Sequence, residues 1–122
     1  MKTILIVDDD PQFCEGLSEL LKLQGHDAAI ANSLAEARSA LINRATDLIL
    51  LDLMLPDGSG LELLEAINTE SDAHVALMTG HAAVKSYVST MAGPGVSYLI
   101  KPIDSGDVSA ILTALDDAAD AA

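Results

Sequence analysis

The sequence is poor in aromatic residues and has a single cysteine. Phe13, Tyr87 and Tyr98 are the only aromatic residues among the 122, and there is no tryptophan, so the core must be aliphatic. Cys14 has no partner for an internal disulfide. Together with the lack of a signal-peptide pattern at MKTILIVDDD, this predicts a reducing, cytoplasmic location. The apolar runs of about five or six residues are too short to span a membrane, which takes roughly 20 residues.

Basic residues are also scarce. Six Lys and Arg stand against 19 Asp and Glu, which gives a formal charge of -13. Nucleic-acid binding relies on Lys and Arg that neutralise phosphates, so this balance argues against a nucleic-acid partner and against an anionic membrane surface. Acidic clusters instead suit a divalent cation or a basic partner surface. The length is that of one domain, and half of the residues are hydrophobic, enough to form a core.

Short apolar runs alternate with stretches of helical periodicity along the whole chain. The runs predict buried strands at residues 3–7, 28–31, 48–51, 75–78 and 97–100. Each helix that follows is marked by apolar residues on its inner face, which are Phe13, Leu17, Leu20, Leu21 and Leu23, then Ala37, Ala40 and Leu41, then Leu61, Leu64 and Ile67, then Val84, Val88 and Met91, and finally Val108, Ile111, Leu112 and Leu115. The alternation predicts an α/β fold, a doubly wound five-stranded parallel sheet with five flanking helices.

The starts of three helices carry recognisable capping residues. Asp10 is placed to cap the first helix, and Pro11 at its first position sacrifices no hydrogen bond. Ser33 followed by Glu36 predicts a capping box, in which each side chain satisfies a free amide. Asp104 is the predicted cap of the last helix. These residues therefore set where the helices begin.

Polar residues that can bind a metal ion or take part in a reaction lie where the predicted strands end. They are Asp8 and Asp9 after the first strand, Asp52 after the third, Thr79 after the fourth and Lys101 after the fifth. Ligand sites of open parallel sheets lie outside the carboxyl ends of the strands, so we expect all five residues at one edge. Carboxylates gathered there can stay ionised around a divalent cation, and oxygen ligands favour magnesium, manganese or calcium over zinc. A carboxylate nucleophile, a cation, a lysine and a hydroxyl together predict acyl-phosphate formation.

Four motifs give the chain a family resemblance. VDDD at residues 7–10, LILLDLMLPDGSG at 48–60, LMTG at 77–80 and YLIKP at 98–102 resemble the receiver domains of two-component response regulators, in order and in spacing. The resemblance covers nearly the whole chain and implies a flavodoxin-like sheet with strand order 2-1-3-4-5. It also implies a role in signal transduction rather than an enzyme, apart from self-phosphorylation and autodephosphorylation.

The resemblance assigns the acceptor and the metal ligands residue by residue. Asp52 would take a phosphoryl group from a histidine of a sensor kinase or of a phosphotransfer protein. Asp8 and Asp9 would hold Mg²⁺ together with Asp52 and the main-chain carbonyl of Met54, and Mn²⁺ is able to substitute. The buried carboxylate of Asp52 would then be compensated by the cation.

It also implies how a signal leaves the site. Thr79 and Lys101 would bind phosphoryl oxygens, and at rest Lys101 would pair with Asp52. A cis peptide bond between Lys101 and Pro102 would point the lysine into the site. Thr79 would move toward the phosphoryl group, and Tyr98 would rotate inward behind it. The surface that changes would comprise the fourth helix, the fifth strand and the fifth helix, and this face is also a candidate homodimer interface.

Some features leave alternatives open. Pro94 and Gly95 depart from the family's usual glycine followed by alanine, which affects the end of the fourth helix. Met54 and His81 stand at the two positions that help set the phosphoryl lifetime, and they do not fix it: Met54 cannot orient a water, whereas His81 can. A small aspartyl-nucleophile phosphatase is one alternative, but it typically has a second aspartate where Met54 stands. A flavin or small-molecule module is another, but no phosphate-binding glycine loop follows the first strand.

The output is not encoded in these residues. Residues 1–122 are expected to form one receiver domain, either a stand-alone phosphorelay intermediate or the excised amino-terminal domain of a longer regulator. The stretch LMLPDGSGLELLEAI resembles receivers that precede transcription-activating ATPase modules, so transcription is one expected output.

Overall fold

The computed structural model describes residues 2–43, 45–70, 73–80 and 96–121. Its elements are β1 (Thr3–Val7), α1 (Pro11–Leu23), β2 (Asp27–Ala31), α2 (Leu34–Asn43), β3 (Leu48–Asp52), β4 (Met54–Leu55), β5 (Gly58–Ser59), α3 (Gly60–Glu70), β6 (His74–Thr79), β7 (Ser97–Ile100) and α5 (Ser105–Ala121). The predicted fourth helix, with Val84, Val88 and Met91, and the sequence Gly93-Pro94-Gly95 lie outside the described residues, as does His81. Within the described ranges, no helix combines the length and apolar content needed to cross a bilayer.

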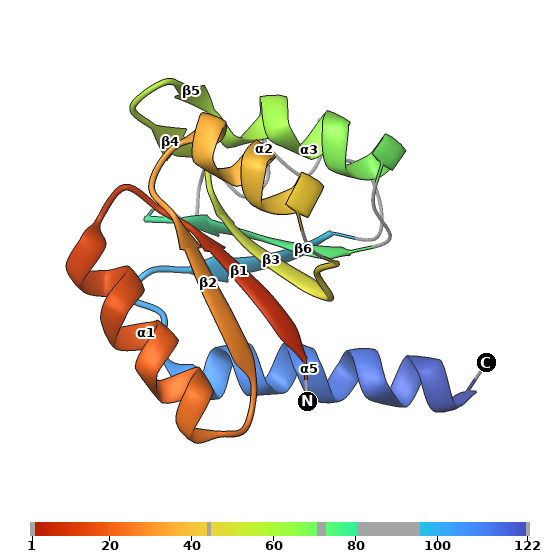
Figure 1. Cartoon of the computed structure of the whole chain (residues 1–122). Coiled ribbons are helices and arrows are strands. Elements are labelled where there is room, and N and C mark those ends of the chain that lie inside the picture. The colour runs from red at the N-terminus through yellow and green to blue at the C-terminus, as the bar shows by residue number, and fades with distance from the viewer. Residues whose placement is uncertain (1, 44, 71–72, 81–95, 122) are drawn as a thin grey trace.

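Five strands form one parallel sheet in the order β2-β1-β3-β6-β7 (Figure 1). With β6 and β7 as the fourth and fifth predicted strands, this confirms the order 2-1-3-4-5. The strands begin or end up to one residue beyond the predicted runs. A short antiparallel pair, β4 and β5, was not predicted and forms part of the loop after β3.

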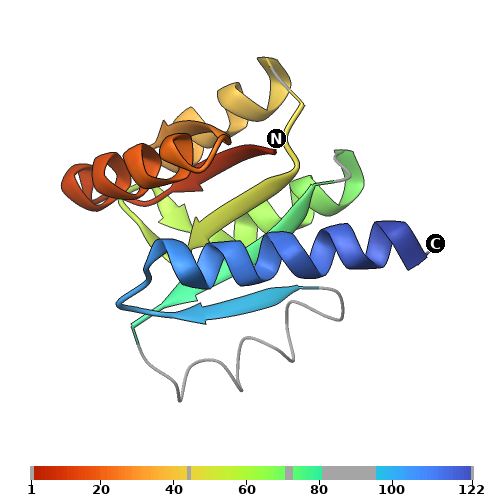
Figure 2. The ribbon, with the colours of Figure 1, turned by 90° about the horizontal axis from the view of Figure 1, so that it is seen from below.

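Helices cover both faces of the sheet. α2 and α3 lie above it in Figure 1, and α1 and α5 lie below it. In Figure 2, seen from below, α5 runs in front of the sheet. Four of the five predicted helices are thus found in the described part of the chain, and they form the two outer layers of a doubly wound fold.

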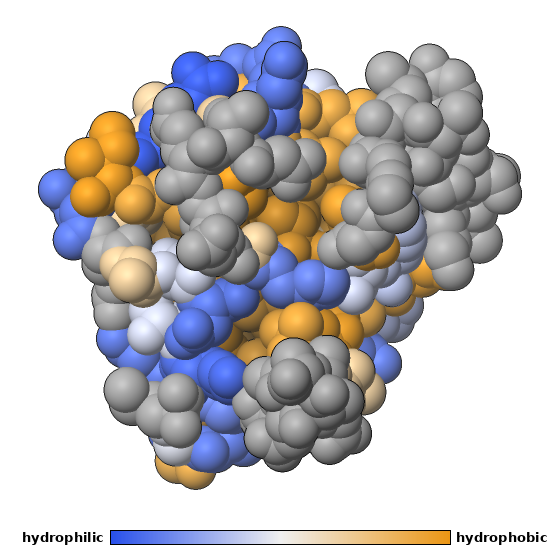
Figure 3. Space-filling model, turned by 90° about the vertical axis from the view of Figure 1, so that its right-hand side faces the viewer, coloured by the Kyte–Doolittle hydropathy of each residue, from blue (hydrophilic) through white to orange (hydrophobic). Residues whose placement is uncertain are grey.

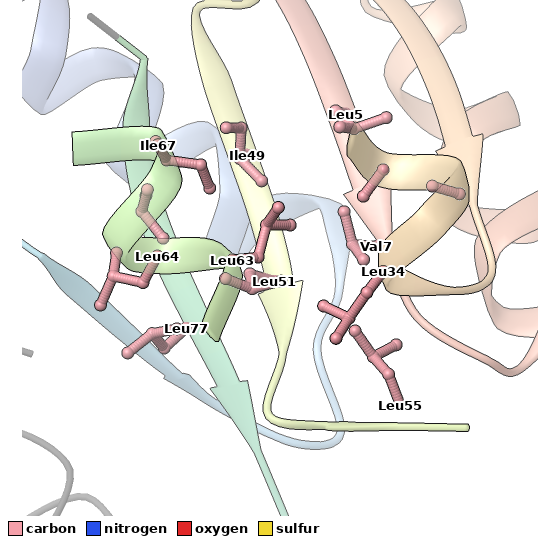
Figure 4. Close-up of a cluster of buried hydrophobic side chains, with 13 residues drawn as sticks. Leu5, Val7, Leu34, Ile49, Leu51, Leu55, Leu63, Leu64, Ile67 and Leu77 are labelled. Carbon is pink, nitrogen blue, oxygen red and sulfur yellow. The ribbon is translucent and has the colours of Figure 1, made fainter. Parts of the chain in front are cut away.

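The sheet separates two hydrophobic clusters, because successive strand residues point to opposite faces. The cluster under α2 and α3, drawn in Figure 4, contains Leu5, Val7, Ile49, Leu51, Val75 and Leu77 from the strands. The cluster on the face of α1 and α5 contains Ile4, Ile6, Leu48, Leu50, Ala76 and Met78. Both faces are buried, which explains why the strands read as continuous apolar runs rather than as alternating patterns.

The predicted inner face of α1 was partly wrong. Leu20 is 46 % exposed and Leu23 is 84 % exposed. The buried residues of this helix are Cys14, Leu17, Ser18 and Leu21. At 3.6 residues per turn these four make one stripe, and Leu23 lies on the opposite side of the helix from it.

Helix caps agree with the sequence at α1 and α5. Asp10 Oδ1 accepts from the amides of Gln12 at 3.1 Å and Phe13 at 3.2 Å. At α5 the carboxylate of Asp104 accepts from the Asp107 amide at 2.9 Å, and that of Asp107 accepts from the Asp104 amide at 3.0 Å. Both predicted caps are confirmed, and the second is reciprocal.

The start of α2 differs from the predicted capping box. Ser33 Oγ accepts from the Glu36 amide at 3.1 Å, as predicted. The Glu36 carboxylate, however, accepts from the Ser33 hydroxyl at 3.4 Å, whereas the prediction gave it the Ser33 amide. One half of the box is therefore present.

The edge where the strands begin faces the viewer in Figure 3 and carries both hydrophobic and hydrophilic residues. Asp47, just before β3, accepts from the Thr3 amide through Oδ2 at 2.8 Å. His74 Nε2 lies 2.7 Å from Ser97 Oγ. These polar groups connect neighbouring strands at the edge opposite the residues predicted to form the site.

Candidate functional site

The predicted site residues lie at the carboxyl ends of the strands. Asp52 and Thr79 are the last residues of β3 and β6, and both are buried. Asp8 follows β1 and is completely buried, whereas Asp9 is exposed. Lys101 follows β7. Because the strands are parallel, their ends meet at one edge of the sheet, as the sequence predicted.

Three carboxylates form a compact acidic cluster. Asp8, Asp9 and Asp52 each offer one oxygen, and these oxygens all lie within 4.8 Å of one another. The donor set is entirely oxygen, and the exposed Asp9 leaves the cluster accessible from solvent. These features fit a hard divalent cation such as Mg²⁺, which binds one or two carboxylates and keeps several waters.

Lys101 supplies the positive charge inside the site. Its Nζ lies 2.7 Å from Asp8 Oδ2 and 3.3 Å from Asp52 Oδ2. The predicted pairing with Asp52 is present, but the lysine is shared and its shorter contact is to Asp8. The bond to Pro102 is cis, as predicted. Nζ also lies 5.5 Å from the centroid of the Phe13 ring, within the range of a cation–π interaction.

The pKa values of the paired groups reflect this crowding. Burial raises the pKa of Asp52, and the negative charge of Asp8 raises it further, against the hydrogen bond from the Met54 amide and the charge of Lys101. Burial by itself lowers the pKa of Lys101, but the contacts with Asp8 and Asp52 outweigh it, and the net shift is upward. The charge of Lys101 therefore does not fully offset the burial of Asp52 beside Asp8.

The main chain of Met54 contacts Asp52, whereas its side chain points to solvent. Its amide donates to Asp52 Oδ1 at 3.3 Å, and its side chain is 80 % exposed. The main chain of Met54 is thus next to the acidic cluster. Its carbonyl remains a predicted ligand.

The two predicted switch residues lie on neighbouring strands. Thr79 is opposite Ile100, and Tyr98 is opposite Leu77, in the β6–β7 pairing. Tyr98 is partly buried against the cluster under α2 and α3, and its hydroxyl oxygen is shielded from solvent. The predicted movement of these residues toward a phosphoryl group stays a prediction.

Three further residues at this edge were not identified from the sequence. Asn32 donates through Nδ2 to the carbonyl of Asp8 at 2.8 Å, and the Cys14 thiol lies 3.5 Å from the same oxygen. Burial, together with the charge of Asp8, raises the pKa of Cys14 to about 12, so it stays a thiol. The position of Asn32 directly after β2 was an available signal. The third is Asp57, in the loop after β3.

A cavity of about 430 Å³ opens beside the acidic cluster. It is lined by Asp10, Phe13, Lys101, Pro102 and Ile103. It joins the start of α1 to the residues after β7, and Lys101 connects it to Asp52. A partner approaching from this side would meet a mixed apolar and charged surface next to the acidic cluster.

Comparison with known proteins identifies the family. The model of the response regulator receiver domain matches residues 4–113. The chain is 31 % identical over 118 residues to the photosynthetic apparatus regulatory protein RegA of Rhodobacter capsulatus, covering 96 % of this chain and 64 % of RegA. The chain therefore spans less than two thirds of that regulator.

Solved structures agree with this assignment. A CheY-like receiver domain from Methanospirillum hungatei JF-1 has a TM-score of 0.84 and 31 % identity, covering 100 % of this chain and 99 % of that one. The response regulator TrrA of Thermotoga maritima, solved in complex with Mg²⁺-BeF, has a TM-score of 0.80 and 31 % identity over 94 % of this chain and 99 % of its own. The chain thus belongs to the response regulator receiver domain family and is a phosphoryl-accepting receiver domain.

Proposed function

We propose that Asp52 is the phosphoryl acceptor and that the donor is a histidine of a sensor kinase or of a phosphotransfer protein. The observation that carries this is the place of Asp52 at the end of β3, within the acidic cluster and 3.3 Å from Lys101 Nζ. In the transfer, the P–N bond to the donor histidine breaks and its electron pair stays on the imidazole. A P–O bond forms at the same time to the carboxylate of Asp52. Such transfer depends on positioning and on charge neutralisation, which this edge of the sheet supplies.

The acidic cluster is the proposed Mg²⁺ site. Asp8, Asp9 and Asp52 would hold the ion together with the main-chain carbonyl of Met54, and Mn²⁺ would fit the same oxygen ligands. A bound ion would neutralise charge on the phosphoryl oxygens. The all-oxygen donor set supports this, as does the similarity to TrrA, which was solved with Mg²⁺-BeF.

The other strand-end residues bind and report the phosphoryl group in this proposal. Lys101 exchanges its contacts with Asp8 and Asp52 for a phosphoryl oxygen, and Thr79 donates its hydroxyl to another. Tyr98 then follows Thr79 toward the interior. The altered surface comprises β7, α5 and the predicted fourth helix, and in this proposal it transmits the signal or forms a homodimer.

The wider role follows from the relatives. Residues 1–122 act as a receiver that controls an output such as transcription, since RegA is a regulatory protein and this chain spans part of its length. A cytoplasmic location belongs to the same proposal, with Cys14 reduced. A phosphatase activity is the competing function, and Met54 stands where such an enzyme typically has its second aspartate.

Acetyl phosphate tests this function directly. The wild-type chain, incubated with acetyl phosphate and Mg²⁺, should gain one labile phosphoryl group by intact-protein mass spectrometry. Asp52→Asn and the addition of chelator should both abolish the gain, whereas Asp47→Asn, at the opposite edge of the sheet, should retain it. Labelling of the Asp52→Asn variant would refute the assignment, and sustained turnover of acetyl phosphate without labelling would favour the phosphatase.

A further inference from the structure

The first amides of α2 are bound by a residue from a different segment. Asp57 Oδ1 accepts from the Leu34 amide at 2.8 Å, and its Oδ2 accepts from the Ala35 amide at 3.1 Å. Free amides at a helix start need such acceptors. At α1 the adjacent Asp10 is the cap. At α2 the adjacent Ser33 accepts from the Glu36 amide, and the first two amides are capped from the loop after β3.

Asp57 occupies the turn of the β4–β5 hairpin. Met54 pairs with Ser59, and Leu55 pairs with Gly58, so Pro56 and Asp57 form the connection. A proline at the first of these two positions and an acidic residue beside it suit a tight turn. The hairpin therefore places the carboxylate of Asp57 three residues from the main chain of Met54.

Packing keeps this hairpin against α2. Leu55 and Leu34 belong to the same hydrophobic cluster and are drawn near each other in Figure 4. Gly58 has φ +150°, and a Cβ there would lie 2.8 Å from the side chain of Leu34 and 2.5 Å from that of Glu62. The positive φ is a backbone conformation that residues with a Cβ rarely adopt, so glycine suits this position of the hairpin.

The two ends of the loop are fixed at the site itself. The Met54 amide donates to Asp52 Oδ1 at 3.3 Å, and the Gly60 amide donates to the Leu53 carbonyl at 2.9 Å. A Cβ on Gly60 would collide with the main-chain carbonyl of Asp52. The loop thus returns to its starting point, and its outer side is fixed through Asp57.

We propose that Asp57 is a positioning residue for the metal site: by capping α2 it fixes the hairpin that carries the main-chain carbonyl of Met54. This inference rests on the proposed function, in which that carbonyl binds Mg²⁺. The amide bonds from Leu34 and Ala35 lower the pKa of Asp57, so the cap is ionised at neutral pH. Since coupling between two sites is reciprocal, Mg²⁺ binding also stabilises the start of α2.

Mg²⁺ affinity of the unphosphorylated chain tests this role by NMR titration. Asp57→Ala removes both acceptors and should weaken Mg²⁺ binding roughly fivefold, the size expected from loss of a helix cap. Asp57→Asn keeps an amide oxygen for the Leu34 amide and should have a smaller effect. Asp47→Ala is the matched control, because Asp47 also accepts from a backbone amide, at 2.8 Å, but at the opposite edge. It should leave Mg²⁺ affinity unchanged.

Two results would overturn the inference. One is equal Mg²⁺ affinity in Asp57→Ala and the wild type. The other is an equal loss in Asp57→Asn and Asp57→Ala, which would mean that Asp57 acts through its charge. Failure of the wild type to bind Mg²⁺ would instead overturn the proposed metal site.

Hydrogen exchange on the wild type gives a second measurement that does not depend on the folding of a variant. Mg²⁺ should slow exchange of the Leu34 and Ala35 amides, and it should leave the Thr3 amide bound by Asp47 unchanged. Exchange at Leu34 and Ala35 that does not respond to Mg²⁺ would also contradict the coupling.

Discussion

Asp52, at the end of β3, and Asp57, in the loop that follows it, experience opposite environments. Asp52 is buried at the end of β3 near the carboxylate of Asp8, and burial and that charge raise its pKa. Asp57 is exposed in the hairpin turn, accepts hydrogen bonds from two backbone amides, and has a lowered pKa. A carboxylate whose oxygens are bound by amides is stable as an anion and serves structure. One that is held against a like charge gains from a cation, which is typical of a functional site.

The largest expected effect comes from removing the positive charge of Lys101, which partly offsets the burial of Asp52. Lys101→Met leaves Asp8 and Asp52 buried together without a counter-charge. We expect it to lower the free energy of unfolding by about 3 kcal/mol at neutral pH in chelator, because breaking a buried pair strands its partner. Urea denaturation measures this, and added Mg²⁺ should restore part of the loss. A variant as stable as the wild type in chelator would show that the two carboxylates do not oppose folding.

The next effect is stabilisation by Mg²⁺ itself. At about a hundredfold excess over its dissociation constant, a ligand specific for the folded state adds about 2.7 kcal/mol. Asp9→Asn, which removes one ligand of the acidic cluster, should lose most of this gain in urea denaturation. Glu19→Gln, an exposed carboxylate of α1, is the control and should keep it. Equal gains in the two variants would exclude Asp9 from the metal site.

The dependence of stability on pH should have opposite signs for the two aspartates. The raised pKa of Asp52 means that its contribution is complete below the ordinary aspartate pKa of 3.8 and is lost as pH rises through its folded value. The lowered pKa of Asp57 means that its contribution is present above 3.8 and is lost as pH falls through its folded value.

Urea denaturation of Asp52→Asn and Asp57→Asn across a pH series in chelator tests these signs. The Asp52 variant should lose the decline in stability that occurs as pH rises above 3.8. The Asp57 variant should lose the decline on the acid side. Curves that change in the same direction for both variants would contradict the distinction between Asp52 and Asp57.

The smallest effect concerns the support of Lys101. Phe13→Leu keeps an apolar side chain but removes the ring that lies 5.5 Å from Nζ. We expect a loss of about 0.5 kcal/mol in stability, as for an exposed cation–π pair. Phe13→Leu should lower stability by less in the Lys101→Met background, because the charge that the ring contacts is already gone. An additive double-mutant cycle would show that the ring does not interact with the charge.

Local patterns predicted most of the fold. The five apolar runs became the strands, and Asp10 and Asp104 cap the helices as expected. Leu20 and Leu23 were misplaced because a helix rich in leucine offers more than one apolar stripe, and only packing on the sheet selects one. The β4–β5 hairpin was not found because two-residue strands carry no periodic signal.

The sequence by itself determined which residues meet at the site. Asp8, Asp52, Thr79 and Lys101 directly end or follow parallel strands, and the ends of such strands lie at one edge whatever the details of packing. The four motifs that indicated the receiver family contain these same residues.

Only the tertiary structure decided how these groups pair. Lys101 lies closer to Asp8 than to Asp52, across 93 residues of sequence, and Asp57 caps α2 across 23. Each choice is set by distances between side chains from separate segments. Strand and helix periodicity does not specify those distances, because they depend on how the loops pack once the sheet has formed.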